Sequence, residues 1–424
     1  MRKRIMLIAS VLTLASATVW AASEKSISFM FQGPDTEIAA WKAAAERFTM
    51  ATDITVELRH TSHEVYNEKI AGYVASNDLP DVVQIDAPFL SNYAWNGYIV
   101  PVEEYLDKDL IADMTPSNIA QCTYPIDGKL YATSEKDSTV LLYGNRKYLE
   151  QIGARIPKTV AEAWTFEEFE GYLEKLSKLP EVKYPLDIMR AYGVKTEWGT
   201  YAFYPAFVSA GGGLINPKTW KANGTLNSPE SIRVAEAFQR WAKNGWIVPS
   251  SAGDNLLFNE KREAALAWNG HWGFAPAFAA MGDDLVAMPL PNFGNGVKTP
   301  NGTWILSISK NADKEASGKF ISFVLKDEGF LKDSEAIAAY PALKSWVSKY
   351  PLYAESGTMA VAAEQSNVAI ARPTHPAYPI ITSAFMKAFD DILNGEDVKR
   401  ALDGAANIID EDIEDNDGYP PFSE

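Results

Sequence analysis

The sequence has little cysteine, little histidine and no long apolar run beyond its first residues. Cys122 is the only cysteine, so no internal disulfide bond is possible, even in an oxidising compartment. The four histidines are scattered, which disfavours a transition-metal site. Beyond residue 21, no run of about 18 apolar residues without a charge occurs, so we expect the mature chain to be soluble.

Several enzyme signatures are also missing. The chain contains no G-x-S-x-G motif of a nucleophilic serine and no G-x-x-x-x-G-K-[ST] phosphate-binding loop. His63 and Glu64 begin an H-E-x-x-H zinc motif, but Asn67 stands where the second histidine is required. We therefore predict a protein without catalytic residues, cofactor or metal, although its many carboxylates leave a glycosidase open as an alternative.

The N-terminus has the pattern of a cleavable signal peptide. Arg2–Arg4 form a basic start, Ile5–Ala17 is apolar but too short to span a bilayer, and small residues precede a cut after Ala21. Cys122 lies far from that cut and so cannot carry a lipid there. We predict a signal peptide at residues 1–21 and a freely diffusing periplasmic protein. An uncleaved membrane anchor is the alternative.

The charge balance excludes one class of partner. The chain has 55 acidic and 39 basic residues, a formal net charge of −16 at pH 7. Such a surface repels nucleic acid and anionic lipid, so we expect no nucleic-acid partner. A mature chain of about 400 residues also exceeds what one hydrophobic core usually supports, which predicts two domains.

The N-terminal part of the mature chain alternates between strand and helix patterns. Apolar or alternating runs predict strands at 26–31, 54–58 and 82–86, and helical spacing predicts helices at 38–48 and 64–76. Strands joined by helices in this order imply a parallel sheet that is covered on both faces.

The same patterns predict the remaining elements. Strands are expected at 129–133, 139–143 and 303–309, and helices at 146–152, 165–178, 229–244, 312–325, 331–350 with a break at Pro341, and 380–410 as two helices joined at Gly395. No repeat and no Pro/Ser-rich linker separates two halves. Two lobes joined by several passes of the chain therefore fit better than two domains in a row.

Aromatic residues are abundant, with 12 Trp and 19 Tyr. Many of them must belong to the core. Trp and Tyr also offer a flat apolar face to a sugar ring and a polar edge to its hydroxyl groups, which makes the excess compatible with a carbohydrate site.

A series of short motifs runs along nearly the whole mature chain. In order, they are Leu79–Val83 with Asp86, Gly97–Pro101, Asp127–Tyr131, Leu142–Asn145, Phe258–Leu266, Asn269–Trp272, Ala371–Pro373 with Tyr378 and Pro379, and Gly395–Ala401. Each motif alone is weak. Their order and spacing resemble the extracellular solute-binding proteins of carbohydrate-import ABC transporters, the family that contains maltose-binding protein. Ser134 and Gly144 depart from the family pattern, the first by replacing a usual proline.

This resemblance implies an α/β protein with the class II periplasmic-binding-protein fold, in which a hinge of crossing strands joins two α/β lobes and a ligand cleft lies between them. The implied N-terminal lobe comprises residues 24–135 and 306–340, and the implied C-terminal lobe comprises residues 136–305 and 341–424. The implied function is to capture a sugar or sugar derivative and deliver it to the membrane subunits of an ABC importer. We expect a monomer that is not an enzyme.

Five ligand-binding residues are expected from the resemblance. Asp137 looks like the family's cleft carboxylate, Trp272 like its stacking tryptophan and Arg372 like its ligand-contacting arginine. The alternatives are a surface ion pair for Asp137, core packing for Trp272 and a structural ion pair for Arg372. Trp198 and Tyr201 lie in the stretch where the family's second lobe lines its cleft.

Three further candidates depend on position in the chain. Asp86 ends an apolar strand, and ligands bind at the carboxyl edge of an open α/β sheet, with helix capping as the alternative. Trp304 lies at a predicted crossing between the lobes, where core packing is equally compatible, and Gln32 lies in the turn after the first strand. Ser62 and His63 follow the second strand, and we interpret them as a helix cap.

Gly212 is the last candidate, since it lies within Gly211–Gly213, whose backbone N–H groups would suit an anionic group. These glycines keep a glycerol phosphodiester or a sulfonated sugar open as ligands, and a polyol is a further alternative. An exported carbohydrate-active enzyme, a glycosidase or a lyase, is the alternative function.

Overall fold

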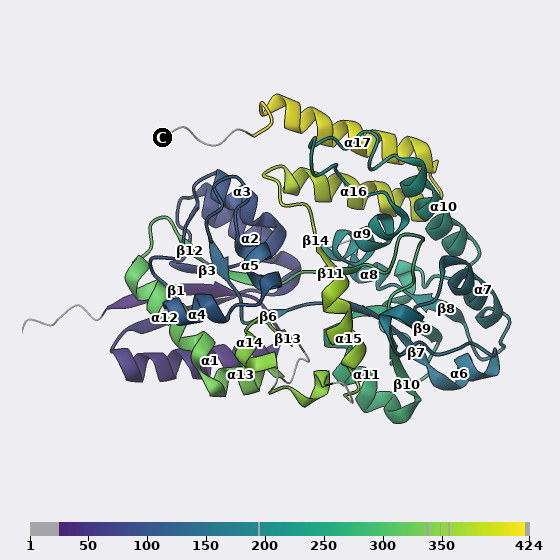
Figure 1. Cartoon of the computed structure of the whole chain (residues 1–424), viewed down its shortest axis with the longest axis horizontal. Coiled ribbons are helices and arrows are strands. Elements are labelled where there is room, and N and C mark those ends of the chain that lie inside the picture. The colour runs from purple at the N-terminus through teal and green to yellow at the C-terminus, as the bar shows by residue number, and fades with distance from the viewer. Residues whose placement is uncertain (1–24, 194–195, 336–338, 348, 355–356, 420–424) are drawn as a thin grey trace, which may run out of the picture.

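The computed structural model describes residues 25–193, 196–335, 339–347, 349–354 and 357–419. The predicted signal peptide, residues 1–21, lies outside these residues. The described chain forms two separate main sheets, each with its own helices, that lie side by side in Figure 1. Each helix in the described part of the chain is too short or too polar to cross a lipid bilayer.

The first sheet is built mainly from the N-terminal third of the chain. Its strand order is β2-β1-β3-β12-β4, and β5 also pairs with β12. The strands are β1 (Ser26–Phe31), β2 (Thr55–His60), β3 (Val82–Asp86), β4 (Ile99–Val100), β5 (Ala132–Thr133) and β12 (Trp304–Ser309). β1 runs parallel to β2 and β3, whereas β12 arrives from much later in the sequence and runs antiparallel to β3. Trp304 thereby pairs with Asp86 at the carboxyl end of β3.

Helices lie on both sides of the first sheet, with α1 and α13 below it and α2 and α3 above it in Figure 1. They are α1 (Asp35–Thr52), α2 (His63–Ala75), α3 (Leu90–Trp95), α4 (Lys108–Asp113), α5 (Pro116–Cys122), α12 (Lys314–Lys326) and α13 (Glu328–Glu335). α1 buries the apolar residues that recur at helical spacing. Among them, the ring of Trp41 lies 4.7 Å from Phe29 of β1 and 4.4 Å from Phe330 of α13.

The second sheet has the strand order β10-β7-β9-β8. Its strands are β7 (Val140–Asn145), β8 (Tyr184–Asp187), β9 (Ala264–Gly270) and β10 (Leu285–Met288). Every residue of β7 and β9 is buried, because both faces of the sheet are covered. This is why these strands have near-continuous apolar runs in place of an alternating pattern.

The second lobe carries helices that follow β7 in the chain. They are α6 (Arg146–Gln151), α7 (Phe166–Leu176), α8 (Arg190–Gly193), α9 (Trp198–Ala210), α10 (Pro229–Lys243), α11 (Phe274–Met281), α15 (Ala360–Gln365), α16 (Tyr378–Leu393) and α17 (Val398–Asp415). The 3-10 turns of the chain are η1 (Ala87–Phe89), η2 (Val160–Glu162), η3 (Ser250–Ala252), η4 (His271–Gly273), η5 (Gly282–Asp284), η6 (Pro351–Tyr353) and η7 (Ser366–Val368). The predicted pair of helices that turns at Gly395 is confirmed, and this glycine has a φ of 101°.

Within the described residues, three passes of the chain join the two lobes. The first runs from β5 to β7, the second from β11 (Thr299–Asn301) to β12, and the third from β13 (Tyr340–Pro341) to β14 (Ala369–Ala371). β6 (Lys136–Asp137) pairs with β13, and β11 pairs with β14, so the passes are hydrogen-bonded to one another. The predicted class II fold, two α/β lobes with crossing strands between them, is confirmed. We propose the division into residues 24–135 and 306–340 for the first lobe and 136–305 and 341–424 for the second.

The helical segment predicted over 331–350 is interrupted at Pro341, as expected, but the sequence did not predict a strand at the interruption. α13 ends at Glu335, Tyr340 and Pro341 form β13, and a short helix, α14 (Lys344–Val347), follows. The strand exists because its backbone pairs with β6, which lies far away in the sequence. A local apolar pattern contains no information about such a partner.

The packing of α12 generates a test of the first lobe. A Cβ atom added to Gly318 would lie 2.2 Å from the carbonyl oxygen of Tyr105, so Gly318→Ala must displace the helix. We expect the free energy of unfolding to fall by about 1–3 kcal/mol. Gly404→Ala in α17 is the matched control, because its Cβ would meet nothing within 4 Å. It should raise the free energy of unfolding by about 0.5–1 kcal/mol. Urea unfolding followed by circular dichroism measures both, and equal effects would contradict the close packing of α12.

Candidate functional site

A cavity of about 450 Å³ lies where the two lobes meet. The first lobe contributes the turn after β1, the start of α2 and the end of β3, and the second lobe contributes the segment before α9 and the turn after β9. Two crossing segments, 136–138 and 302–304, and Arg372 after β14 complete the lining. This volume is in the range of small-molecule sites in proteins.

Eight of the nine predicted site residues line this cavity. They are Gln32, Asp86, Asp137, Trp198, Tyr201, Trp272, Trp304 and Arg372. They come from segments that are far apart in the sequence and from both lobes. Their convergence is therefore a product of the tertiary structure.

Gly212 does not line the cavity, and the prediction for it is corrected. It follows the C-terminal end of α9, whereas the N-terminal end of that helix faces the cavity. Its N–H donates to the carbonyl of Phe207 at 2.9 Å, and the N–H of Gly213 donates to Ser231 Oγ at 3.4 Å. Because these amides are used within the fold, they do not form the anion site that the glycines suggested.

Arg372 is the centre of the site. Its side chain is only 3% exposed, and both terminal nitrogens donate to the carboxylate of Asp86, with Nη1 and Oδ2 2.9 Å apart. Nη1 also donates to Glu197 Oε2 at 3.0 Å. Asp86 ends β3 of the first lobe, and Glu197 immediately precedes α9 of the second. One guanidinium group therefore links the two lobes through charge-assisted hydrogen bonds.

These contacts bear on the alternatives for two predicted residues. Asp86 precedes η1 but makes no capping hydrogen bond to it, so helix capping is not its role. Arg372 forms a structural ion pair, which was the alternative to a ligand contact. Its Nε atom, however, is buried and has no hydrogen-bond partner among the described residues. The same side chain therefore connects the lobes and retains one donor.

Glu197 was not predicted from the sequence. Its Oε2 atom accepts from Tyr378 Oη at 2.6 Å, and its Oε1 atom accepts from Thr382 Oγ1 at 2.7 Å. Burial raises the pKa of Glu197, whereas the positive charge of Arg372 lowers it. Only its position next to Trp198 in the sequence pointed towards the site.

Asp137 is anchored to the first lobe. Its carboxylate accepts from Ser117 Oγ at 2.5 Å and Gln121 Nε2 at 3.3 Å, both on α5, and from the N–H of Ser138 at 2.8 Å. Burial raises the pKa of Asp137, and these hydrogen bonds lower it. Asp137 is buried and held by neutral donors, so the alternative of a surface ion pair is wrong.

A second buried cation stands beside the cavity. The ammonium of Lys136 lies 2.9 Å from Glu37 Oε2 and 3.5 Å from Glu135 Oε1. Burial lowers the pKa of Lys136, but these two carboxylates raise it further, and the net result lies above the ordinary value. Like Arg372, this cation lies between two carboxylates.

Aromatic rings form the wall of the cavity in the second lobe. Trp272 and Tyr201 stack at 6.3 Å with 27° between their planes, and Trp198 meets Trp272 edge-on at 5.7 Å. The ring of Trp272 lies over Gly270, where a Cβ would come within 2.3 Å of it. Trp272 is nevertheless 37% exposed, so core packing does not describe it.

The first lobe contributes aromatic side chains on the other side of the cavity. His63 stacks on Tyr192 of the second lobe at 5.7 Å with 21° between the planes, and its Nδ1 atom lies 3.2 Å from Gln32 Oε1. Trp304 meets His63 edge-on at 5.4 Å. Ser62 occupies the N-cap position of α2, but its hydroxyl makes no capping hydrogen bond. Ser62 and His63 both line the cavity, which favours a ligand contact over the cap that the sequence suggested.

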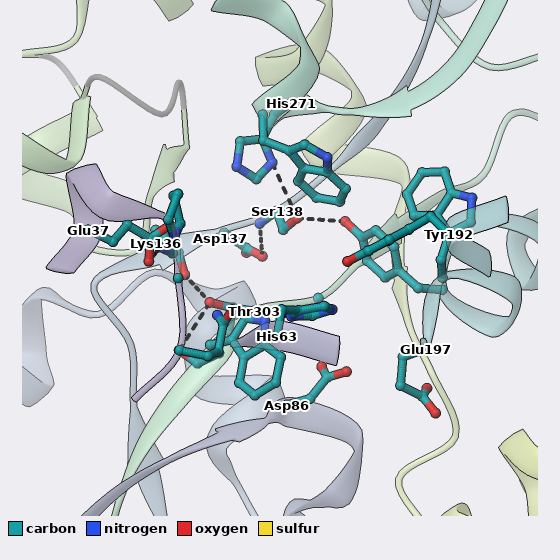
Figure 2. A pocket seen from close by; sticks show the side chains of 18 of the residues that line it. Glu37, His63, Asp86, Lys136, Asp137, Ser138, Tyr192, Glu197, His271 and Thr303 are labelled. Atoms are coloured by element: carbon teal, nitrogen blue, oxygen red, sulfur yellow. Dashed lines mark hydrogen bonds and ion pairs between the residues drawn. The ribbon is translucent and has the colours of Figure 1, made fainter. Parts of the chain in front are cut away.

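Ser138 and His271 are further lining residues that the sequence did not indicate. The Ser138 hydroxyl lies 2.7 Å from Tyr201 Oη and 3.3 Å from His271 Nδ1, as the dashed lines in Figure 2 show. Burial lowers the pKa of His271 to about 3, with a further contribution from Lys136, so the ring is neutral at physiological pH. Each of these residues is adjacent in sequence to a predicted one, which is the only local signal for it.

The ion pairs of Arg372 generate a test. Arg372→Met would leave Asp86 and Glu197 buried together without a cation, and we expect the free energy of unfolding to fall by about 3–5 kcal/mol at neutral pH. Loss of the cation raises the pKa of Glu197 further above its unfolded value. A raised carboxyl pKa reduces stability as the pH rises through it, so the deficit should shrink as the pH is lowered towards about 5.

Arg400→Met is the matched control, because Arg400 pairs with Glu396 on the exposed side of α17. It should cost less than about 1 kcal/mol at either pH. Urea unfolding at the two pH values measures both variants. A deficit for Arg372→Met that does not change with pH would contradict the role assigned to its ion pairs.

Comparisons with known proteins agree with this architecture. Residues 43–361 match the family described as bacterial extracellular solute-binding protein. The maltotriose-binding protein of Pyrococcus abyssi (strain GE5 / Orsay) is 22% identical over 371 residues, which cover 84% of this chain and 75% of that protein. Among solved structures, maltose-bound MalE3 of T. maritima has a TM-score of 0.78 at 19% identity, with 91% of this chain and 99% of the other covered. The ABC substrate-binding protein Lmo0181 of Listeria monocytogenes, in complex with cycloalternan, has a TM-score of 0.77 at 19% identity, with 92% and 99% covered.

These structural likenesses concern the fold, and the family match extends over most of the chain. This chain belongs to the bacterial extracellular solute-binding protein family.

Proposed function

We propose that this protein captures a sugar or sugar-like ligand in the cavity between its lobes and delivers it unchanged to the membrane subunits of an ABC importer. It would act as a monomer in the periplasm after removal of a signal peptide at residues 1–21. The observation that carries the proposal is one cavity in which the exposed ring of Trp272 stands near buried carboxylates and a guanidinium. Relatives named for maltotriose and maltose support a carbohydrate ligand.

The two kinds of lining group match the two kinds of surface on a sugar. Trp272, which is 37% exposed, offers a ring face to the apolar side of a pyranose or furanose ring, and the buried ring of Tyr201 stacks on it. Asp86 uses its oxygens for Arg372 but keeps lone pairs that accept from hydroxyl groups, and the free Nε of Arg372 is a donor for a hydroxyl oxygen. In a closed cavity that excludes water, a polar group without a partner costs free energy. Each of these hydrogen bonds therefore contributes to ligand affinity.

The charges of the lining favour an uncharged ligand. Among the residues that the structure describes, five carboxylates line the cavity, those of Glu37, Glu64, Asp86, Asp137 and Glu197, against two cations, Lys136 and Arg372. Both cations already contact two carboxylates each. A sulfonated sugar or a phosphodiester would meet this negative excess without a free cation, whereas a neutral sugar or polyol would not be repelled.

The same contacts favour a binding protein over a glycosidase. Asp86 and Glu197 are both held by Arg372, and Asp137 accepts three hydrogen bonds from the protein. A general acid needs a carboxyl group that keeps a proton and points it at the substrate. Asp86 and Glu197, tied to a guanidinium, and Asp137, held by three hydrogen-bond donors, are poor candidates for that task, so we propose that nothing is turned over.

The crossing strands support capture by closure of the lobes. Rotation about the three passes would open the cavity without breaking either sheet. A ligand shifts the balance towards the closed form only by as much as it binds that form better. The contacts of Arg372 with both lobes are the kind that differ between the two forms.

A ligand screen tests the proposed function. Neutral mono-, di- and trisaccharides and polyols should include at least one compound that raises the melting temperature, because a ligand that binds only the folded state stabilises it. Sulfonated and phosphorylated sugars should give smaller shifts. Chromatography of oligosaccharides after long incubation should recover them intact. A panel without any shift, or a released product, would contradict the proposal.

The aromatic wall provides a sharper test. Trp272→Ala removes a ring face and should weaken binding of the best neutral sugar by roughly ten- to a hundredfold, measured by isothermal titration calorimetry. Phe278→Ala is the control, because Phe278 is 42% exposed and lies outside the cavity lining. Both variants should keep the unfolding midpoint close to that of the wild type. Equal affinities for the two variants would mean that the ligand binds elsewhere.

A further inference from the structure

One segment of the second lobe supplies much of the aromatic lining. Between β8 and α9 it carries Tyr192, and the first turn of α9 adds Trp198 and Tyr201. We propose that Asp254, supported by Asp187, is a positioning residue that holds Tyr192 in the cavity wall and against the first lobe. This proposal rests on the proposed function, because it concerns how the same cavity is shaped for its ligand.

Asp254 binds this segment through two backbone donors. The N–H of Ala191 donates to Oδ1 at 3.0 Å, and the N–H of Tyr192 donates to Oδ2 at 2.9 Å. Both N–H groups belong to α8, a single helical turn, and amides in the first turn of a helix have no acceptor inside it. A carboxylate from a distant part of the chain thus takes the place of a helix cap and sets where Tyr192 stands.

Asp187 joins the segment after β8, which leads to Tyr192, to the segment that contains Asp254. This fully buried carboxylate at the end of β8 accepts from the N–H groups of Met189 and Leu256, each at 2.8 Å. Met189 and Asn255 have left-handed backbones, with φ of 53° and 62°, which side chains make unfavourable. The pKa of Asp187 is raised to about 6, because burial raises it by more than the backbone N–H groups lower it. The contacts of Asp187 therefore stabilise both turns and keep Asp254 at the start of α8.

The polar contacts behind the wall continue to Trp272. Asn255 Oδ1 accepts from Asn269 Nδ2 at 3.1 Å, and Asn269 Oδ1 accepts from the N–H of Gly270 at 2.7 Å. The ring of Trp272 lies over Gly270. The network that begins at Asp254 therefore supports both ends of the aromatic wall.

Tyr192 is also a point at which the second lobe meets the first. Its ring stacks on His63, and both side chains are labelled in Figure 2. Burial lowers the pKa of His63, and three nearby carboxylates, those of Asp86, Glu64 and Glu37, raise it by less. A displaced Tyr192 would expose His63 to water. The titration of His63 therefore reports the position of Tyr192 without any ligand.

The test compares Asp254→Ala with Asp410→Ala. Asp410 is a matched control, because its carboxylate accepts the N–H groups of Ala222 at 2.6 Å and Asn223 at 3.2 Å, and none of these three residues lines the cavity. Both substitutions leave two backbone amides without their acceptor, so both should reduce stability. Stability alone does not separate a positioning role from a structural one.

Two measurements separate these roles. In an NMR titration, the pKa of His63 should rise towards its ordinary value in Asp254→Ala and in Tyr192→Ala, and should not change in Asp410→Ala. Calorimetry with maltose, maltotriose and the best sugar of the screen should show affinity about tenfold weaker for Asp254→Ala and unchanged for Asp410→Ala. In a Tyr192→Ala background, Asp254→Ala should add less than about a twofold loss, because both changes act on the same ring.

An unchanged His63 titration in Asp254→Ala overturns the proposal, as does a loss of affinity that is equal with and without the Tyr192 side chain. If the alanine variant does not fold, Asp254→Asn replaces it. Asp254→Asn keeps one acceptor oxygen. It should therefore raise the pKa of His63 and weaken sugar affinity, each by less than Asp254→Ala would. If His63 responds as stated but the wild-type protein binds no sugar of the screen, the positioning role stands and the proposed function fails.

Discussion

The contact of Arg372 with Asp86 and Glu197 is the interaction on which the rest of the site depends. A charge inside a protein is stable only when it is paired and hydrogen-bonded, and here one guanidinium pairs with a carboxylate from each lobe. The end of β3 and the start of α9 are thereby held at a fixed separation. The cavity between them has its shape because these two elements cannot move independently while the pairs are intact.

The same arrangement of charges recurs at the hinge, where Lys136 lies between Glu37 and Glu135. Two cations, each held by two carboxylates, leave a cavity that is rich in acceptors and poor in free positive charge. The aromatic wall complements this polar side with apolar ring faces. The carboxylates of the buried Asp187 and the partly buried Asp254 have a different role, since they accept backbone N–H groups of the segment that carries part of the wall.

Prediction from the sequence succeeded where a residue's environment follows from its neighbours in the chain. Asp86 was placed at a sheet edge because it ends a buried apolar run, and α16 and α17 were separated at Gly395 because glycine tolerates a positive φ. Trp272 and Arg372 entered through motif order. Prediction failed for Gly212, whose N–H donates to the carbonyl of Phe207 at the end of α9. It also failed for β13, whose partner strand is remote in sequence.

By itself, the sequence predicted the two-lobed α/β class, most helices and strands, and nine candidate site residues, because periodic burial and motif order can be read along a chain. That eight of the nine line one cavity was decided by the tertiary structure. Only the tertiary structure decided that Arg372 joins Asp86 to Glu197, that His63 stacks on Tyr192, and that Asp254 holds the turn beneath that ring. These pairs involve residues separated by long stretches of chain. Their distances depend on how two lobes pack around three crossing strands, which no local pattern encodes.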